Sequence, residues 1–346
     1  MFFASDNSGP AHPKVIEAMM RSNEGFRFSY GADPEMDRVR TLIRDLFEAP
    51  EASVYLVSTG TAANSIALAT LTEPWQTIFC TKLSHINEDE CNAPEFYSGA
   101  KLTTVADENA KMTPTTLHTA MSAEEVRGVH GPQRGPVSIT QITEKGTVYT
   151  INELNALTSV AKEFGVATQL DGARFANAIV TLGCTPAEMT WKAGIDCVCF
   201  GGTKNGLIGV EAVVFFNPKH AWEFELRRKR GAHLTSKHRY LSAQMEAYLE
   251  GDLWLELAKS ANASGQRLVD GLRKYNNVTF PFKPEANMMF FNAPRNLHKK
   301  VKAAGAQYYV MGSLEGDEDE PVLGRLVCDW SVGFNGVDSF LAALEE

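Results

Sequence analysis

Hydrophobic runs that alternate with amphipathic stretches predict a repeating order of strands and helices over residues 50–220. The first strand is expected at Val54–Val57, followed by a glycine turn and an alanine-rich helix that ends near Leu71. Further strands are expected at 78–80, 102–105, 137–141, 166–170, 196–200 and 211–216, and helices at 151–164 and 175–182. Strands rich in β-branched residues that alternate with crossover helices are typical of a mostly parallel sheet with both faces covered. The sequence therefore predicts an α/β fold.

The pattern changes on either side of this block. Before it, Asp33 and Pro34 supply an N-cap and a first-turn proline for an amphipathic helix. After it, residues 221–275 are expected to be helical, and the acidic run 315–320 to be a solvated loop. The remainder predicts strands at 288–291, 308–310 and 326–328, and helices at 298–304 and from residue 336. We expect a large domain with an N-terminal arm over residues 1–250 and a small C-terminal α/β domain over residues 251–346.

Composition and charge narrow the class of partner. The 346 residues are 44% hydrophobic and 22% charged, within the range of globular proteins. A net charge of -9 repels phosphate backbones, so nucleic acid is not an expected partner. No window approaches the ~18 apolar residues of a membrane helix, and the N-terminus lacks a basic region before an apolar one. These features predict a cytoplasmic protein with small-molecule or protein partners.

The six cysteines predict no disulfide framework. They are spread through a mid-sized chain that has no C-x-x-C spacing, so reduced thiols are expected, and neither a zinc nor a redox site is expected. Cys197 and Cys199 are two positions apart in an apolar run, which places both on one face of a strand. We expect them to be small core residues.

Two residues that follow predicted strands carry the most informative chemistry. Lys204 lies in the glycine-flanked segment 200–206, and a desolvated lysine can form a Schiff base with an aldehyde. Asp171 ends the preceding strand, 33 positions earlier, which is about one βαβ unit. Alone, Lys204 could be a turn residue and Asp171 a helix N-cap. Together at the carboxyl edge of a sheet, they are the pair that holds the aldehyde and the pyridine nitrogen of pyridoxal phosphate.

A phosphate site is expected at Gly60 and Thr61, within Thr59–Asn64. A helix that begins directly after a strand and a glycine turn presents free N–H groups that favour an anion. This signal is weak alone, because many α/β proteins carry such a turn. His85 follows the next strand, where its ring could stack on the pyridine ring of a cofactor.

These motifs resemble a known family when they are taken together. They are Ser5-Asp6-Asn7, Tyr30-Gly31-Ala32-Asp33, residues 60–64, His85, Asp89-Glu90-Cys91, residues 170–175, residues 190–194 and residues 200–206. Over nearly its whole length the chain resembles the fold-type I pyridoxal-phosphate enzymes, and within them the low-specificity L-threonine aldolases of the β-eliminating lyase group. The resemblance implies an aspartate aminotransferase-like large domain with a small C-terminal domain.

The resemblance also implies roles for individual residues. Catalytic roles fall to Lys204, which would hold the cofactor, to Asp171 at its pyridine nitrogen, to His85 stacked on the ring and to His130 near the substrate hydroxyl. Contacts to the cofactor are implied for Gly60, Thr61, His85, Asp171, Arg174, Lys204, Lys237 and Arg239. Contacts to the substrate are implied for Ser5, Tyr30, His85, His130, Arg174 and Arg325, with Ser5 and the two arginines at its carboxylate.

The implied reaction is the cleavage of L-threonine, L-allo-threonine and related L-3-hydroxy-α-amino acids, phenylserine included, to glycine and an aldehyde. The resemblance further implies a homodimer or homotetramer with shared active sites.

Three alternative functions remain open from the sequence. A β-eliminating lyase or an aminotransferase would use the same cofactor-binding residues. A nucleotide-binding module would use only residues 59–64, and that segment lacks a G-x-x-x-x-G-K-[ST] pattern. A catalytically silent regulator would use none of these residues.

Overall fold

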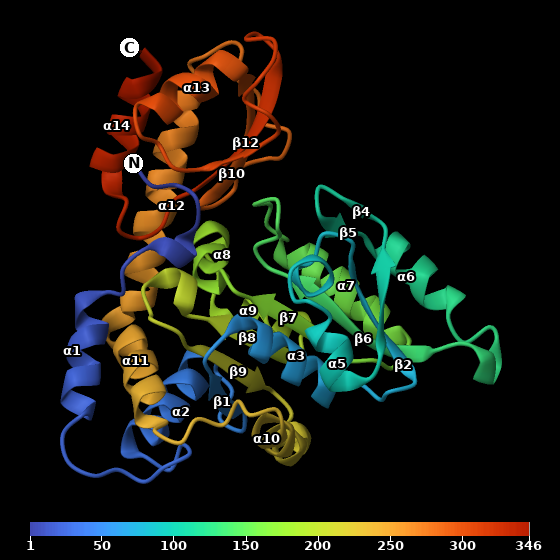
Figure 1. The fold of residues 1–346 in the computed structure, drawn as a ribbon. Helices are drawn as coiled ribbons and strands as arrows, with labels where there is room; N and C mark the ends of the chain where they lie inside the picture. Colours follow the sequence, from blue (N-terminus) through green and yellow to red (C-terminus); the bar gives the residue numbers. More distant parts are fainter. Residues whose placement is uncertain (346) are drawn as a thin grey trace.

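A seven-stranded sheet forms the centre of the larger part of the molecule in the computed structural model, which describes residues 1–345 (Figure 1). Across the sheet the strands are β1 (Ser53–Val57), β9 (Glu211–Phe215), β8 (Cys197–Gly201), β7 (Thr168–Gly172), β6 (Gln133–Thr140), β2 (Gln76–Thr81) and β3 (Lys101–Val105). All neighbours from β3 to β8 are parallel, whereas β9 is antiparallel to both β8 and β1. The predicted mostly parallel sheet is therefore confirmed.

Side chains alternate between the two faces of the sheet, and each face has its own core. In β8, Val198 and Phe200 point into the main core, while Cys197 and Cys199 point into the core under α3 and α10. The period of two along a strand explains this division. It confirms that the two cysteines are buried core residues, and all six cysteines of the chain are unpaired.

Helices cover both faces of the sheet, and several of them begin at a side-chain cap. At the start of α7, Thr150 and Glu153 form a capping box, in which each side chain accepts a hydrogen bond from the other residue's backbone N–H. The helices of this part are α1 (Pro13–Ser22), α2 (Pro34–Leu46), α3 (Gly60–Thr70), α4 (His85–Glu88), α5 (Ala93–Ser98), α6 (Pro114–Ala123), α7 (Ile151–Glu163), α8 (Phe175–Leu182), α9 (Pro186–Met189), α10 (Ala221–Arg230) and α11 (Arg239–Leu249). No helix among residues 1–345 combines the length and hydropathy needed to cross a bilayer.

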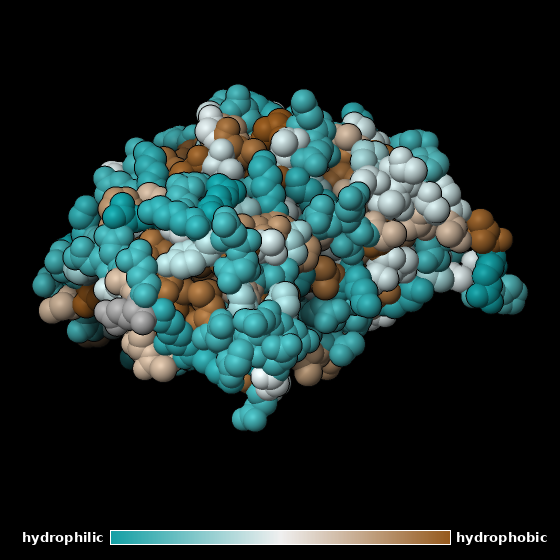
Figure 2. Space-filling view, turned by 90° about the horizontal axis from the view of Figure 1, so that it is seen from above, coloured by the Kyte–Doolittle hydropathy of each residue, from teal (hydrophilic) through white to brown (hydrophobic). Residues whose placement is uncertain are grey.

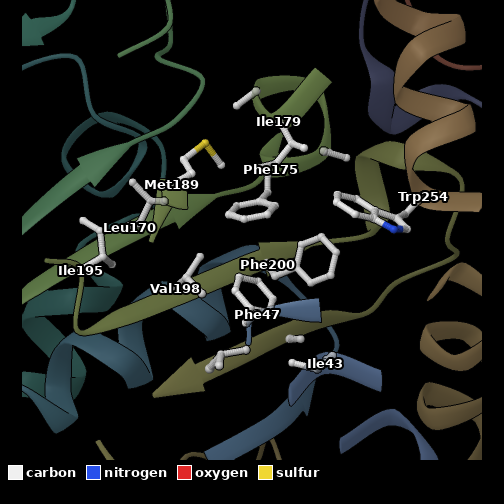
Figure 3. Close-up of a cluster of buried hydrophobic side chains, with 14 of the residues drawn as sticks. Ile43, Phe47, Leu170, Phe175, Ile179, Met189, Ile195, Val198, Phe200 and Trp254 are labelled. Carbon is white, nitrogen blue, oxygen red and sulfur yellow. The ribbon is translucent and has the colours of Figure 1, made fainter. Parts of the chain in front are cut away.

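An aromatic cluster fills the main core between the sheet and its helices (Figure 3). The ring of Phe200 lies 5.1 Å from that of Phe175, 5.9 Å from Phe47 and 5.7 Å from Trp254, all edge to face. Phe200 belongs to β8, directly before the segment that carries Lys204. The cluster therefore anchors the strand end from which the site is built.

The smaller part is a three-stranded antiparallel sheet covered by helices. Its strands lie in the order β10 (Met288–Pro294), β12 (Pro321–Val327) and β11 (Tyr309–Met311), and its helices are α13 (Arg295–Ala303) and α14 (Gly333–Glu345). The long α12 (Leu253–Leu272) contributes Trp254 and Leu257 to the main core and Leu268 and Leu272 to the smaller core. Figure 1 shows α12 running from one part into the other, with both chain termini beside the smaller part.

The first residues of the chain pack on the smaller part. Phe3 is fully buried in its core, its N–H donates to Gln307 O at 2.7 Å, and its carbonyl accepts from Val327 N at 2.9 Å. The sequence analysis assigns this arm to the large domain, whereas the structure packs its first residues on the smaller part. The predicted boundary at residue 250 falls between α11 and α12.

Most predicted elements are present, with ends shifted by a few residues. β7 runs two residues further than predicted, so Asp171 lies within the strand, and the acidic run 315–320 forms no regular structure and is largely exposed. Patterning missed α1, α4, α5, α6, α9 and the short hairpin of β4 (Asp107–Glu108) and β5 (Lys111–Met112). The hairpin and the shortest helices have too few residues to show a period, and α6 is only weakly amphipathic, whereas the amphipathic pattern of α1 was overlooked.

Replacing Phe200 with alanine tests the importance of the aromatic cluster. Because this side chain is fully buried against four other rings, we expect Phe200→Ala to lower the free energy of unfolding by about 3–5 kcal/mol. Chemical denaturation measures this change, with Trp222→Ala, at a site that is 70% exposed, as the control. Equal losses in the two variants would contradict the assignment.

Candidate active site

The carboxyl ends of five strands and the amino end of β9 meet around one cavity of about 390 Å³. In a parallel sheet these ends share one edge, which is where α/β folds bind ligands. Six of the residues expected at the site line the cavity: Gly60, Thr61, His85, Asp171, Arg174 and Lys204. Asn7, Asn64, Glu90, Glu144 and Glu211 line it as well.

Lys204 enters the cavity from η4 (Thr203–Asn205), a single turn after β8. The neighbouring Asn205 fixes this turn, because its amide donates to Tyr248 Oη at 2.7 Å and to Trp254 O at 2.9 Å. Gly206 then adopts a φ of +95°, which a residue with a Cβ rarely reaches. Burial and the nearby Arg174 charge lower the pKa of Lys204, and Asp6 and Asp171 oppose that shift. A lysine with a lowered pKa is a better nucleophile at neutral pH.

Asp171 is held with its carboxylate facing the cavity. Its Oδ1 accepts from Ala173 N at 3.0 Å and its Oδ2 accepts from Asn64 Nδ2 at 2.9 Å. The next helix, α8, has Arg174 rather than Asp171 at its N-cap position. The helix-cap interpretation of Asp171 is therefore excluded, and the carboxylate remains available to a ligand.

A continuous hydrogen-bond network links His85 to Asp171. His85 Nδ1 lies 2.8 Å from Glu90 Oε1, and the Asn64 amide donates to both Glu90 Oε1 and Asp171 Oδ2 at 2.9 Å. Gln169 Nε2 in turn donates to Asn64 Oδ1 at 3.0 Å. The hydrogen bond to Glu90 raises the pKa of His85, against the effect of burial. Asn64 thus orients two carboxylates at once, a role that sequence patterning did not assign.

Two further carboxyl groups in the cavity were also missed. Glu144 Oε1 accepts from His85 N at 2.8 Å, and Glu211 Oε2 accepts from Gly202 N at 2.7 Å. Burial raises the pKa of each to about 7. Glu211 opens β9 and Glu144 follows β6, so a search for polar residues at every strand end could have found both.

The residues expected at a substrate carboxylate meet where the two parts of the molecule join. Arg174 pairs with Asp6, and Arg325 Nη2 donates to Ala4 O at 3.0 Å while its guanidinium lies 4.7 Å from the centre of the Tyr309 ring. Ser5 caps η1 (Asp6–Ser8), since its Oγ accepts from Asn7 N at 3.1 Å. Arg174, Arg325 and Ser5 therefore lie on segments that contact one another.

Ser5 and Arg325 do not line this cavity, and four further expected residues also lie outside it. His130 is exposed in η2 (Gly128–His130), before β6, and the eight residues of β6 separate it from the cavity by about 25 Å. The segment after α6, which includes η2, projects at the right edge of the molecule in Figure 1, and Figure 2 shows hydrophobic atoms exposed at the same edge. Tyr30 is 46% exposed, and its N–H donates to Ser236 O at 3.1 Å. Lys237 is exposed, and Arg239 Nη1 donates to Gly25 O at 2.9 Å.

The raised pKa of Glu144 predicts a pH-dependent stability. Because the folded state holds this proton up to about pH 7 and the unfolded state only to about 4.5, its contribution is lost as pH rises through that window. We expect Glu144→Gln to become more stable relative to wild type between pH 5 and pH 8, as measured by urea denaturation. The exposed Glu51→Gln should show no such change. A Glu144→Gln difference that is constant with pH would contradict the assignment.

Comparisons with known proteins agree with this geometry. Residues 3–294 match the Beta-eliminating lyase family. The chain is 40% identical to a low specificity L-threonine aldolase of a Pseudomonas species, over 95% of this chain and 92% of the relative. It is 38% identical to the enzyme of the same name from Pseudomonas aeruginosa, over 97% and 94%.

A solved structure supports the same grouping. The threonine aldolase of Leishmania major superposes with a TM-score of 0.92 at 27% identity, covering 99% of this chain and 98% of that one. This match confirms the fold-type I class that the family resemblance implied. The chain belongs to the Beta-eliminating lyase family.

Proposed function

We propose that this protein is a pyridoxal-phosphate-dependent aldolase, a carbon–carbon lyase. It would cleave L-threonine, L-allo-threonine and related L-3-hydroxy-α-amino acids to glycine and an aldehyde. The observation that carries the proposal is the convergence of Lys204, Asp171 and the N-terminus of α3 on one cavity. The two Pseudomonas relatives and the Leishmania major structure, all described as threonine aldolases, support it.

The residues of the cavity fit pyridoxal phosphate at three separate points. The N–H groups of Gly60 and Thr61 donate to no other residue among 1–345, and a Cβ at Gly60 would meet nothing within 4 Å, so a phosphate has both donors and room. Asp171 offers a carboxylate oxygen to a protonated pyridine nitrogen. Lys204 offers an amine to the aldehyde. When bound, this cofactor supplies an aldehyde that captures the substrate amine and a ring that withdraws electrons from its α-carbon.

The chain's own residues would bind the amino acid and move its protons. Arg174 and Arg325 would hold the carboxylate, which fixes the direction of the Cα–Cβ bond. His85 Nδ1 lies against the Glu90 carboxylate, which only accepts, so Nε2 is left to take the β-hydroxyl proton. Lys204 Nζ, with its lowered pKa, would return a proton to the α-carbon.

The residues outside the cavity fit an oligomer with shared sites. Tyr30, His130, Lys237 and Arg239 would complete the site of a neighbouring subunit in a homodimer or homotetramer. Phe26 and Phe28, near Tyr30 in the chain, are 100% and 81% exposed, and such apolar surface favours an interface.

Lys204 is tested by substitution. We expect Lys204→Ala to lose the covalent link to the cofactor and to cleave threonine at least about 100-fold more slowly. Borohydride reduction makes a lysine–cofactor bond permanent, so mass spectrometry should detect the added mass in wild type and in the exposed-site control Lys219→Ala, but not in Lys204→Ala. A reduced Lys204→Ala protein that still carried the cofactor would refute the assignment.

The reaction class is tested by its products. Incubation with L-threonine, L-allo-threonine and L-phenylserine should release aldehyde and glycine in equal amounts. His85→Asn should slow this release by about 10²- to 10⁴-fold, since the variant loses the proposed base. A keto acid with ammonia in place of glycine would instead identify a β-eliminating lyase, and transfer of the amino group an aminotransferase.

A further inference from the structure

The first residues of the chain hold both arginines of the site. Ala4 O accepts from Arg325 Nη2 at 3.0 Å. Asp6 accepts from Arg174 twice, from Nε to Oδ2 at 2.6 Å and from Nη2 to Oδ1 at 2.9 Å. The Asp6 side chain is only 1% exposed. A short N-terminal segment therefore fixes two guanidinium groups that come from different parts of the molecule.

The pairing with Asp6 uses one edge of Arg174 and leaves another open. Guanidinium N–H groups form two forks suited to a carboxylate: a side-on fork of Nε and Nη2, and an end-on fork of Nη1 and Nη2. Asp6 occupies the side-on fork. Arg174 also lines the cavity, and no residue among 1–345 accepts from its Nη1. The end-on fork is thus free to face a ligand.

Asp6 does not depend on Arg174 alone for its position. Asn287 Nδ2 donates to Asp6 Oδ2 at 3.2 Å and to Cys328 O at 2.9 Å, which ties Asp6 to the smaller part. The hydrogen bonds of Phe3 to Gln307 and Val327 anchor the backbone three residues earlier. The Asp6 carboxylate is therefore held in place by the smaller part, and it can fix the orientation of the Arg174 guanidinium.

From this geometry we propose that Asp6 is a positioning residue for the substrate carboxylate. By gripping the side-on fork of Arg174, it turns the end-on fork toward the amino acid and so sets the direction in which the carboxylate is held. This inference rests on the proposed function, and it adds a residue that determines selection for α-carboxylates over simple amines.

The charge of Asp6 acts in the opposite direction to its positioning role. Burial raises the pKa of Asp6, but the positive charges of Arg174 and Lys204 outweigh this effect, and the net shift is downward. The carboxylate of Asp6 is therefore ionised at neutral pH. A negative charge beside Arg174 weakens the attraction of other anions. Removing the charge alone would strengthen binding of a carboxylate, whereas losing the orientation would weaken it. The sign of the effect therefore separates the two roles.

The test uses the cofactor-loaded enzyme and two amines. Glycine carries the α-carboxylate and ethanolamine lacks it, and the visible absorbance of the bound cofactor reports the binding of each. We expect Asp6→Asn to bind glycine about 10- to 100-fold more weakly, since hydrogen bonds to a charged group are lost. Ethanolamine affinity should change less than twofold. The kcat/KM for L-threonine should fall by the same factor as glycine affinity.

The chain offers a matched control in a second side-on pair. Asp338 accepts from Arg267 Nε at 2.6 Å and Nη2 at 2.9 Å, but on the surface of the smaller part. Asp338→Asn should leave both affinities unchanged. Asp6→Glu keeps the charge with one more methylene, and it should lose less glycine affinity than Asp6→Asn. If Asp6→Asn does not fold, Asp6→Glu carries the test, with a glycine-selective loss of several-fold expected.

Three results would overturn the inference. Tighter glycine binding by Asp6→Asn would make Asp6 a neutralising charge, and equal losses for glycine and ethanolamine would make it a purely structural residue. Unchanged glycine affinity would remove any role. Each of these can occur while wild type binds the cofactor and cleaves threonine, so failure of the inference is distinct from failure of the proposed function.

Discussion

Charges brought into the cavity must be paired there, and the rest of the site depends on this constraint. An ionised group taken out of water is costly unless an opposite charge or a hydrogen-bond donor replaces the water. Asp171 meets the condition through Asn64, His85 through Glu90, and Arg174 through Asp6. Each partner also fixes the atom that is left facing the cavity, which is what the proposed chemistry requires.

The order of strands explains how a few short segments bring all the polar residues of the cavity together. Five parallel strands end at one edge, so the turn after each strand brings a polar residue to the same place without a special fold of its own. The reversed β9 adds Glu211 from its first residue rather than its last. The aromatic packing around Phe200 and the hydrogen bonds of Asn205 then keep the Lys204 turn in position from behind.

Local signals in the sequence predicted the sheet, most helices and the central residues of the site. Lys204, Asp171 and Gly60 were predictable because each directly follows or ends a strand with glycine nearby. Asp6 lies in the motif Ser5-Asp6-Asn7, but the sequence predicts no role for it, since its partner Arg174 lies 168 positions away and no periodicity connects them. Asn64 and Glu144 were missed for the same reason: their roles arise only when separate strand ends meet. His130 and Tyr30 lie outside the cavity of this chain. Their distance from the cavity depends on the three-dimensional fold, and the local sequence around each residue does not indicate it.

The docking of Phe3 between residues 307 and 327 has a consequence for synthesis. A ribosome releases the N-terminus first, and the large sheet can form as its strands emerge. Phe3, however, finds its hydrogen-bond partners only when nearly the whole chain has been made. Ala4 therefore reaches Arg325 only at the last stage of assembly. A translation product that ends before residue 325 contains Lys204 and Arg174 but lacks the second arginine of the proposed carboxylate site.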